Sequence, residues 1–220
     1  MASNFGKTIQ VATFGASHGY AIGGIVEGLP CGHTIDIDEL QAFLKRRAPG
    51  QNQLQTQRKE ADIPEFLSGM VDGMLSGSPL AFMIRNTSQH SGDYNNLRDI
   101  PRPSHADFTA RMRYGDKVDM RGGGHFSARL TAPLCVAGGI ALQLLREKGI
   151  EIHGHLKQVG TIQDTPIDMV HPDMQALAHI ATKPIAMVDA NKRTEVENLV
   201  MQLKKDGDST GGIVEVIATG

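Results

Sequence analysis

The sequence predicts an α+β fold, and three observations support this prediction. Short β-prone runs occur at 9–14, 23–28 and 80–84. Apolar residues at helical spacing mark separate helices, one starting at Asp36 and one over 134–148. The chain also contains 25 glycines, which suggests tight loops between its elements. A chain that mixes short strands with helices in this way is typical of an α+β domain.

The first predicted helix begins at Asp36, which has a glutamate three residues later at the spacing of a capping box. A Pro-Gly pair at 49–50 ends it. Leu40, Leu44 and Arg47 fall at i, i+4 and i+7, on one stripe of this helix. Arg47 therefore closes the apolar side of the helix, where a solvated charge is not expected.

A second helix is predicted over 105–114, after a stretch at 86–104 that has almost no apolar periodicity. Long irregular stretches of this kind are usually functional or disordered. Ser104 and Asp107 again have the spacing of a capping box, so we expect His105 in the first turn of this helix.

The rest of the chain continues the mixture of strands and helices. The main helix ends at Gly149, and we interpret the polar, turn-rich residues 50–62 as an extended loop or flap. No repeat or linker interrupts the sequence, so we expect a single domain over 1–220 that is incomplete at its C-terminus. The further expected elements are a strand over 150–159, helices near 173–181 and 192–205, and a strand over 211–218.

The charge, the cysteine count and the hydropathy of the chain indicate the kind of partner and the compartment to expect. The formal net charge is −2, which gives no overall basic field, so nucleic acid is not the expected partner. Only Cys31 and Cys135 are present, as in proteins of a reducing compartment. No signal sequence opens the chain, and no apolar run approaches the length of a membrane span. We therefore expect a cytoplasmic protein that binds anions through local arginine placement.

The most informative segment runs from Arg121 to Arg129 and reads Arg-Gly-Gly-Gly-His-Phe-Ser-Ala-Arg. Its three glycines allow the backbone to approach a ligand closely. A donor-rich loop that leads into a helix N-terminus is suited to holding an anion such as phosphate. An ordinary glycine turn before a buried helix explains this segment equally well when it is taken alone.

Two histidines lie in segments of similar character. Ser17 and His18 follow a strand and lie near glycines, in the type of loop that often displays catalytic groups. His105 is expected at a helix start, where the helix dipole and burial both disfavour the imidazolium. For each position alone, a histidine without a catalytic task remains the alternative.

Arginines accompany these segments. Arg47, Arg102 and Arg129 could together surround a doubly charged phosphate with forked donors, although each could also simply solvate a surface. No metal site is expected, because His153 and His155 have no third ligand at a zinc spacing and are read as a polar strand face. The motifs of serine hydrolases, P-loop proteins and dinucleotide-binding folds are absent. The residues alone thus indicate an enzyme of an anionic substrate with two imidazoles for proton transfer.

These segments resemble the signatures of the chorismate synthase family. The match covers four ordered blocks between residues 14 and 129, and residues after 150 are compatible but less distinctive. The blocks are Phe-Gly-Ala-Ser-His-Gly at 14–19, Arg-Ala-Pro-Gly-Gln at 47–51 with Thr-Gln-Arg-Lys-Glu at 56–60, Arg-Pro-Ser-His-Ala-Asp at 102–107, and the glycine segment at 121–129.

The resemblance implies a lyase of the shikimate pathway, within aromatic amino-acid biosynthesis. Such an enzyme converts 5-enolpyruvylshikimate 3-phosphate to chorismate by a 1,4-anti elimination of phosphate. It needs reduced FMN although the reaction involves no net redox change, and NADPH is a candidate external source of reducing equivalents. The implied fold is a β-α-β sandwich with helices packed between antiparallel sheets, assembled as a homotetramer.

The resemblance also implies roles for individual residues. His18 would protonate the reduced flavin, and His105 would assist the departing phosphate. The implied substrate-binding residues are Ser17, Arg47, Arg102 and Arg129, and the implied FMN contacts are His125, Phe126 and Ser127.

The sequence departs from the family pattern at four positions. Ala16 replaces a usual Glu, His125 replaces a frequent Arg, and Ala48 and Gln53 stand where basic residues are often seen. Two rival functions stay open: a non-catalytic phosphate- or flavin-binding module, and a histidine-dependent phosphatase.

Overall fold

The computed structural model describes residues 3–48, 60–87 and 100–220. The predicted flap at 50–62 and the irregular stretch at 86–104 therefore lie largely outside the described residues. The chain divides into two compact units. The described part of unit 1 comprises residues 3–48, 60–87 and 100–144, and unit 2 comprises residues 145–220.

Unit 1 contains an antiparallel five-stranded sheet in the order β1-β2-β3-β7-β4. In the register of this sheet, Gly15 lies opposite Ile22, and Ala21 lies opposite Arg85. The turn after β2 and the end of β7 therefore lie at the same end of these strands. The strands are β1 (Asn4–Phe5), β2 (Gln10–Gly15), β3 (Ala21–Glu27), β4 (Pro64–Ser68) and β7 (Leu80–Arg85), beside a small pair of β5 (Met70–Val71) and β6 (Met74–Leu75).

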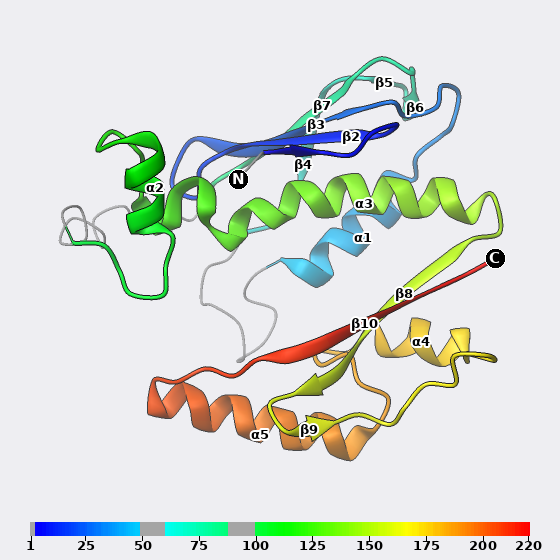
Figure 1. The fold of residues 1–220 in the computed structure, drawn as a ribbon. Helices are drawn as coiled ribbons and strands as arrows, with labels where there is room; N and C mark the ends of the chain where they lie inside the picture. The colour runs from blue at the N-terminus through cyan, green and yellow to red at the C-terminus, as the bar shows by residue number, and fades with distance from the viewer. Residues whose placement is uncertain (1–2, 49–59, 88–99) are drawn as a thin grey trace. The chain divides into compact units, whose positions relative to one another are not determined.

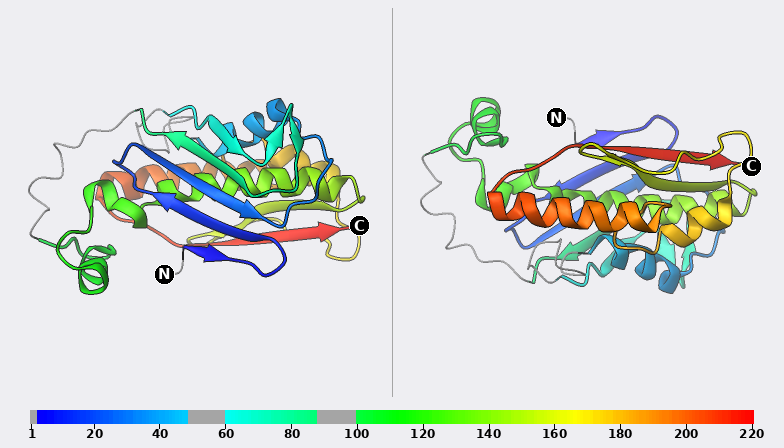
Figure 2. Two further views of the ribbon diagram at one scale, coloured as in Figure 1. Left: turned by 90° about the horizontal axis from the view of Figure 1, so that it is seen from above. Right: turned by 90° about the horizontal axis from the view of Figure 1, so that it is seen from below.

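Two helices complete the core of unit 1. The sheet covers one side of α3 (Thr131–Arg146), and α1 (Ile37–Arg47) packs along α3 (Figures 1 and 2). The helices approach closely at Gly139, where a β-carbon would come 2.5 Å from Leu40 Cδ1. Gly138 faces open space, so only one of the two glycines that suggested close packing has this role.

The start of α1 follows the sequence prediction. Asp36 is the N-cap, and its carboxylate accepts a 2.8 Å hydrogen bond from the Glu39 amide. Gln143 of α3 also binds the backbone N–H and C=O of Asp36, both at 2.9 Å. The cap is thus tied to the core helix.

The start of α2 (Asp107–Tyr114) does not follow the prediction. Its N-cap is Ala106, and no side chain caps it. Ser104 has φ +57°, a left-handed conformation that takes it out of the capping geometry. The predicted capping box over Ser104 and Asp107 is therefore wrong, and His105 precedes the helix instead of lying in its first turn.

One segment of the described residues, Arg121–Arg146, is long and apolar enough by composition to be considered as a membrane span. Its continuous α-helix, α3, has only 16 residues, whereas about 20 are needed to cross a bilayer. Val136 and Ile140 of α3 are fully buried in the core of unit 1. These features are typical of the core helix of a globular unit.

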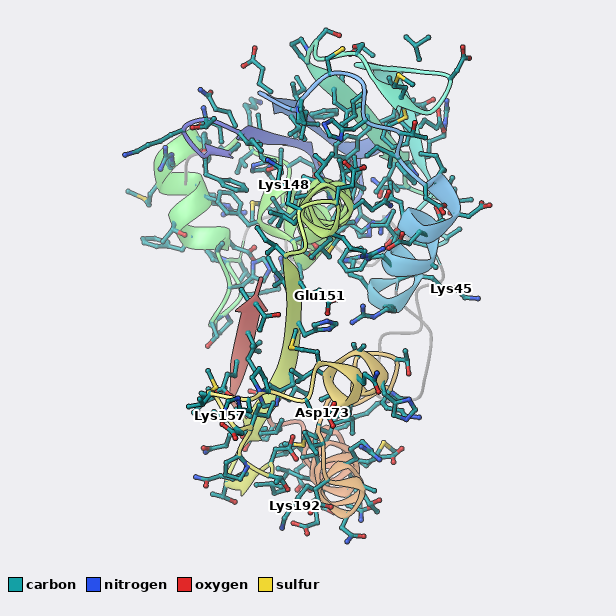
Figure 3. All side chains as sticks on the ribbon, turned by 90° about the vertical axis from the view of Figure 1, so that its right-hand side faces the viewer. Lys45, Lys148, Glu151, Lys157, Asp173 and Lys192 are labelled. Atoms are coloured by element: carbon teal, nitrogen blue, oxygen red, sulfur yellow. The ribbon has the colours of Figure 1, made fainter. Side chains whose placement is uncertain are left out.

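Unit 2 has its own antiparallel sheet, in the order β10-β8-β9, and the helices α4 and α5 cover one face of it (Figure 2). Small apolar clusters on this face centre on Leu177 of α4 and on Met187 and Val196. Charged side chains such as Lys157 and Lys192 lie outside these clusters (Figure 3). The elements are β8 (Glu151–Val159), β9 (Ile162–Gln163), α4 (Met174–Ile180), α5 (Ala190–Asp206) and β10 (Gly212–Thr219).

The mixture of helices and antiparallel sheets confirms the predicted α+β class. The short strands β1, β4, β5, β6 and β9 were not predicted. β4 begins at a proline and carries a register shift between Phe66 and Ser68, which obscures the alternation of a strand. The expected polar strand face in β8 is wrong at His155, which is 2% exposed and lies 3.0 Å from Glu215.

Candidate functional site

The first part of the site is the turn between β2 and β3, which carries Ser17 and His18. Both residues are buried, and the Ser17 hydroxyl lies 3.2 Å from His18 Nδ1. The Ser17 amide donates a 3.0 Å hydrogen bond to the Gly124 carbonyl. This bond ties the Ser-His turn to the glycine segment, more than a hundred residues later in the chain.

Asn86, directly after β7, holds the same turn from its other side. Its Nδ2 donates to the carbonyls of Ala16, at 3.0 Å, and Gly19, at 2.8 Å. Its Oδ1 accepts a hydrogen bond from Arg129 Nε at 3.3 Å. Asn86 therefore connects the Ser-His turn to Arg129, and sequence analysis did not identify it because its role depends on strand pairing.

The glycine segment forms 3-10 turns at Arg121–Phe126 and Ala128–Leu130, which lead into α3. Gly122, Gly123 and Gly124 have φ values of +57°, +91° and +55°, in the region that favours glycine. A β-carbon on Gly122 would overlap the His18 ring, and one on Gly123 would lie 3.1 Å from His105 Nε2. Two imidazoles thus lie against consecutive glycines. A larger residue at 122 would displace the His18 ring, and one at 123 would press tightly on His105.

His105 is held in a cluster with Arg102 and Asp107. Its Nδ1 lies 2.6 Å from Asp107 Oδ1 and 3.3 Å from Arg102 Nη2. The Asp107 carboxylate is buried and accepts from the backbone amide, Nε and Nη2 of Arg102 at 2.8–3.0 Å. The Arg102 guanidinium therefore lowers the pKa of Asp107 far below its ordinary value. Asp107 is ionised at neutral pH.

Another acidic residue, Asp119, lies close enough to His18 to interact with its charge. Asp119 accepts hydrogen bonds from the Arg121 amide at 3.1 Å, from Nε at 2.9 Å and from Nη2 at 2.8 Å. These bonds lower the pKa of Asp119, and the positive charge of a protonated His18 contributes in the same direction. The first arginine of the glycine segment is thus bound to a neighbouring carboxylate.

Arg47 and Arg129 come together on the carboxylates of Glu60 and Asp62. Arg129 is 4% exposed and donates to Asp62 Oδ1 and, at 3.1 Å, to Glu60 Oε2. Arg47 donates to Asp62 Oδ2 at 2.7 Å, and its side chain is 23% exposed. Asp62 thus bridges two guanidinium groups, in a buried network that satisfies its charge.

The roles of these two carboxylates were not predicted from the sequence. Glu60 belongs to the recognised block at 56–60, so it had a sequence signal, whereas Asp62 had none. Asp62 has φ +52°, a backbone conformation that residue patterns do not reveal. The structure therefore brings Arg47 and Arg129 together through acidic partners, while Arg102 belongs to the His105 cluster.

A separate pocket of about 440 Å³ lies beside the glycine segment. His125 Nδ1 donates to the Gly15 carbonyl at 3.0 Å, and Nε2 lies 2.9 Å from Ser3 Oγ. The Phe126 and Tyr114 rings are 6.1 Å apart. Ser127 instead accepts a hydrogen bond from the Arg129 amide at 3.3 Å. The residues that line the pocket are Ser3, Tyr114, Lys117, Val118, His125 and Phe126.

Among residues 3–48, 60–87 and 100–220, no group of three or more His, Cys, Asp or Glu side chains is arranged to hold a metal ion. The described residues of the site provide two imidazoles, clustered arginines with carboxylate partners, and an aromatic pocket. These groups can transfer protons and bind an anion.

Comparison with known proteins identifies the family. A sequence model of the chorismate synthase family matches residues 9–220. The chain belongs to the chorismate synthase family. It is 42% identical to a chorismate synthase of Lancefieldella parvula over 231 residues, covering 100% of this chain and 60% of that protein. It is 44% identical to one of Ralstonia pickettii over 219 residues, covering 99% of this chain and 57% of that protein.

Structure comparison agrees with this assignment. A crystal structure of a chorismate synthase superposes with a TM-score of 0.73 at 25% sequence identity, covering 96% of this chain and 58% of that one. The chain thus spans about three-fifths of the length of the chorismate synthases that it matches.

The structure gives local accounts of two departures from the chorismate synthase pattern. Ala16 contributes its carbonyl to Asn86, a contact that does not depend on its side chain. His125 uses both ring nitrogens, on the Gly15 carbonyl and on Ser3. Ala48 is buried as the C-cap of α1, and Gln53 lies outside the described residues.

Proposed function

We propose that this protein acts in chorismate synthesis, as a lyase that eliminates phosphate from 5-enolpyruvylshikimate 3-phosphate to give chorismate. The observation that carries the proposal is the placement of His18 and His105 against the consecutive glycines 122 and 123. The elimination needs proton transfer and charge stabilisation on a departing phosphate, and two imidazoles with nearby arginines can supply both. Family membership supports the reaction class and its place in aromatic amino-acid biosynthesis.

The arginines differ in how well the geometry supports anion binding. Arg102 is the strongest candidate, because its Nη2 lies 3.3 Å from His105 Nδ1 and thus beside a proton-transfer group. Arg47 is next, since its side chain is partly exposed. All three arginines are bound to carboxylates, but Arg129 is only 4% exposed and is held by both Glu60 and Asp62. Direct contact of Arg129 with a substrate would therefore require the largest rearrangement. Ser17 would contact the substrate beside His18.

The pocket beside the glycine segment is the proposed flavin site. Its volume of about 440 Å³ lies within the usual range of ligand pockets. Phe126 and Tyr114 offer aromatic surface to a ring system, and Lys117 offers a positive charge to a phosphate. His125 and Phe126 fit the proposed FMN contacts, whereas Ser127 would act through the backbone of Arg129. Reduced FMN, when bound, supplies the flavin chemistry on which the family's reaction depends.

Other properties of the proposal follow the family. We propose a cytoplasmic enzyme that works as a homotetramer in its full-length form, with NADPH as the external source of reducing equivalents. Neither a membrane nor a nucleic acid is proposed as a partner. Since the chain spans about three-fifths of its relatives, its own turnover is the point to measure.

The decisive experiment incubates the protein with 5-enolpyruvylshikimate 3-phosphate and photoreduced FMN under anaerobic conditions. Chorismate and phosphate should form together. His18→Ala and His105→Ala should each lower turnover by about 10²–10⁴-fold, because a general acid or base contributes on that order. His171→Ala, at an exposed position in unit 2, is the matched control and should keep full activity.

Two outcomes would contradict the proposal. A non-catalytic binding module would bind FMN equally well in all three variants and form no chorismate. A phosphatase would release phosphate from generic esters without flavin. The absorption spectrum of the reduced flavin in each histidine variant would also show which imidazole supplies its proton.

A further inference from the structure

The side chain of Asn86 contacts two parts of the site that lie far apart in the sequence. It is buried, and it contacts both the Ser-His turn and Arg129. We propose that Asn86 is a positioning residue, whose side-chain amide holds the turn so that the His18 ring lies against Gly122. The consequence for turnover rests on the proposed function, whereas the position of the ring can be measured without any turnover.

Asn86 holds the turn through three carbonyl groups. Its Nδ2 donates to the carbonyls of Ala16 at 3.0 Å and Gly19 at 2.8 Å. Its backbone amide donates to the Tyr20 carbonyl at 3.1 Å. These carbonyls lie on both sides of the Ser-His pair in the sequence. One residue therefore fixes the backbone before and after that pair.

The glycine segment requires the turn to stay in this place. The Ser17 amide donates to the Gly124 carbonyl at 3.0 Å. The His18 ring fills the space where a β-carbon of Gly122 would lie. A small shift of the turn would therefore either press the ring onto the glycine backbone or separate the two. The position of the imidazole thus depends on the groups that hold the turn.

The neighbours of the Asn86 amide fix its orientation. Arg129 Nε can only donate, and it donates to Oδ1 at 3.3 Å. The two carbonyls of the turn can only accept, so they require the NH₂ group. Among side chains of this size, asparagine presents an acceptor and two donors, whereas aspartate presents only acceptors. A hydrogen bond from the guanidinium also polarises the amide and strengthens its donors. Arg129 therefore supports the turn through Asn86.

The decisive variant is Asn86→Asp, which keeps the size of the side chain. The carboxylate still offers an acceptor to Arg129, but it sets an oxygen against the two turn carbonyls in place of the donors. The turn should therefore move, and the His18 ring should leave Gly122. The readout is the nuclear Overhauser effect between the His18 Hε1 proton and the Gly122 α-protons. It should be present in the unaltered protein and lost in Asn86→Asp, and its retention in the folded variant would overturn the proposal.

Asn86→Leu separates the proposal from a simpler alternative, in which Asn86 only satisfies the buried Arg129. Under the proposal, Asn86→Asp and Asn86→Leu both lose the Overhauser effect, because neither side chain can donate to the turn. Under the alternative, only Asn86→Leu loses it, because a carboxylate is a strong partner for a guanidinium. Asn191→Asp, the same change at an exposed position in unit 2, is the matched control and should leave the effect unchanged.

Turnover gives the second readout, under the proposed function. In Asn86→Asp, kcat should fall by about 100-fold, the cost of a misplacement of about 1 Å, while the KM for 5-enolpyruvylshikimate 3-phosphate should stay close to that of the unaltered protein. An unchanged kcat in a variant that has lost the Overhauser effect would refute the catalytic consequence. If the unaltered protein has no turnover, the proposed function fails, and the Overhauser effect alone decides the role of Asn86.

The unaltered protein also provides a test if neither variant folds. The Nδ2 protons of Asn86 donate to two carbonyls at a buried position. They should therefore exchange with solvent more slowly than the side-chain amide protons of Asn191, which is exposed. Equal exchange rates of the two groups would overturn the proposal.

Discussion

At the scale of single residues, the glycine segment owes its composition to the side chains that surround it. Gly122 and Gly123 both have positive φ, and the space where their β-carbons would lie is occupied by His18 or borders His105. The sequence predicted that the glycines allow a close approach of the backbone, but not that these side chains are their neighbours. The same residues that allow the turn therefore also set the positions of the two imidazoles.

Gly122→Ala should abolish the turnover proposed above and destabilise unit 1 by about 1–3 kcal/mol, because it adds a strained left-handed residue to a steric overlap with His18. Urea unfolding and the turnover assay measure the two effects. Gly138→Ala is the control, since its β-carbon would meet nothing within 4 Å. In helix α3 it should stabilise the protein by about 0.5–1 kcal/mol. Equal behaviour of the two variants would refute this account.

At the scale of elements, helix ends were predictable where the capping groups are local. Asp36 caps α1 as its spacing indicates. The same spacing at Ser104 and Asp107 failed, because Arg102 and His105 bind the carboxylate that would have completed the cap. The spacing of a capping box therefore predicts a cap only where no nearby charged group binds the side chain that the cap needs.

Elements also meet in the buried network of Arg47, Glu60, Asp62 and Arg129. Asp62→Asn should lower the free energy of unfolding of unit 1 by about 3–5 kcal/mol, because it removes the carboxylate that bridges Arg47 and Arg129 and leaves two guanidinium groups with only the charge of Glu60. Asparagine tolerates the left-handed backbone at this position, so the change tests the charge. Urea unfolding followed by signals from unit 1 gives the measurement.

The control for this prediction is Glu65→Gln. Glu65 pairs with Arg85 at 2.5 Å, but both side chains are at least 40% exposed, so the variant should cost less than about 1 kcal/mol. A loss at Asp62 no larger than at Glu65 would mean that the buried network contributes little to stability.

At the scale of the whole molecule, the chain has separate apolar cores in its two units. The net charge of −2 gives no general attraction for anions. The three arginines that were predicted to bind the substrate, Arg47, Arg102 and Arg129, all lie in unit 1, and each is paired with a carboxylate there.

The core of unit 2 can be tested at Met187, which is fully buried with Ile185 and Val196. Met187→Ala should destabilise unit 2 by about 2–5 kcal/mol through lost burial and a cavity. Hydrogen exchange of the β8 and β10 amides should accelerate accordingly. Met169→Ala is the control, because this position is 62% exposed. It should change the free energy of opening obtained from the exchange rates by no more than about 0.5 kcal/mol. Unchanged protection in Met187→Ala would show that this cluster does not stabilise the sheet.

The sequence by itself determined the α+β class, most of the longer elements and the family, because periodicity, local turns and ordered motifs are written in neighbouring residues. It also predicted that Ser17, His18, His105 and the glycine segment belong to one site. Only the tertiary structure decided that the two imidazoles lie against consecutive glycines. It also decided that Asn86 and Asp62 organise the arginines. These contacts depend on strand pairing and positive-φ backbone, which bring together residues far apart in the chain and have no local signature.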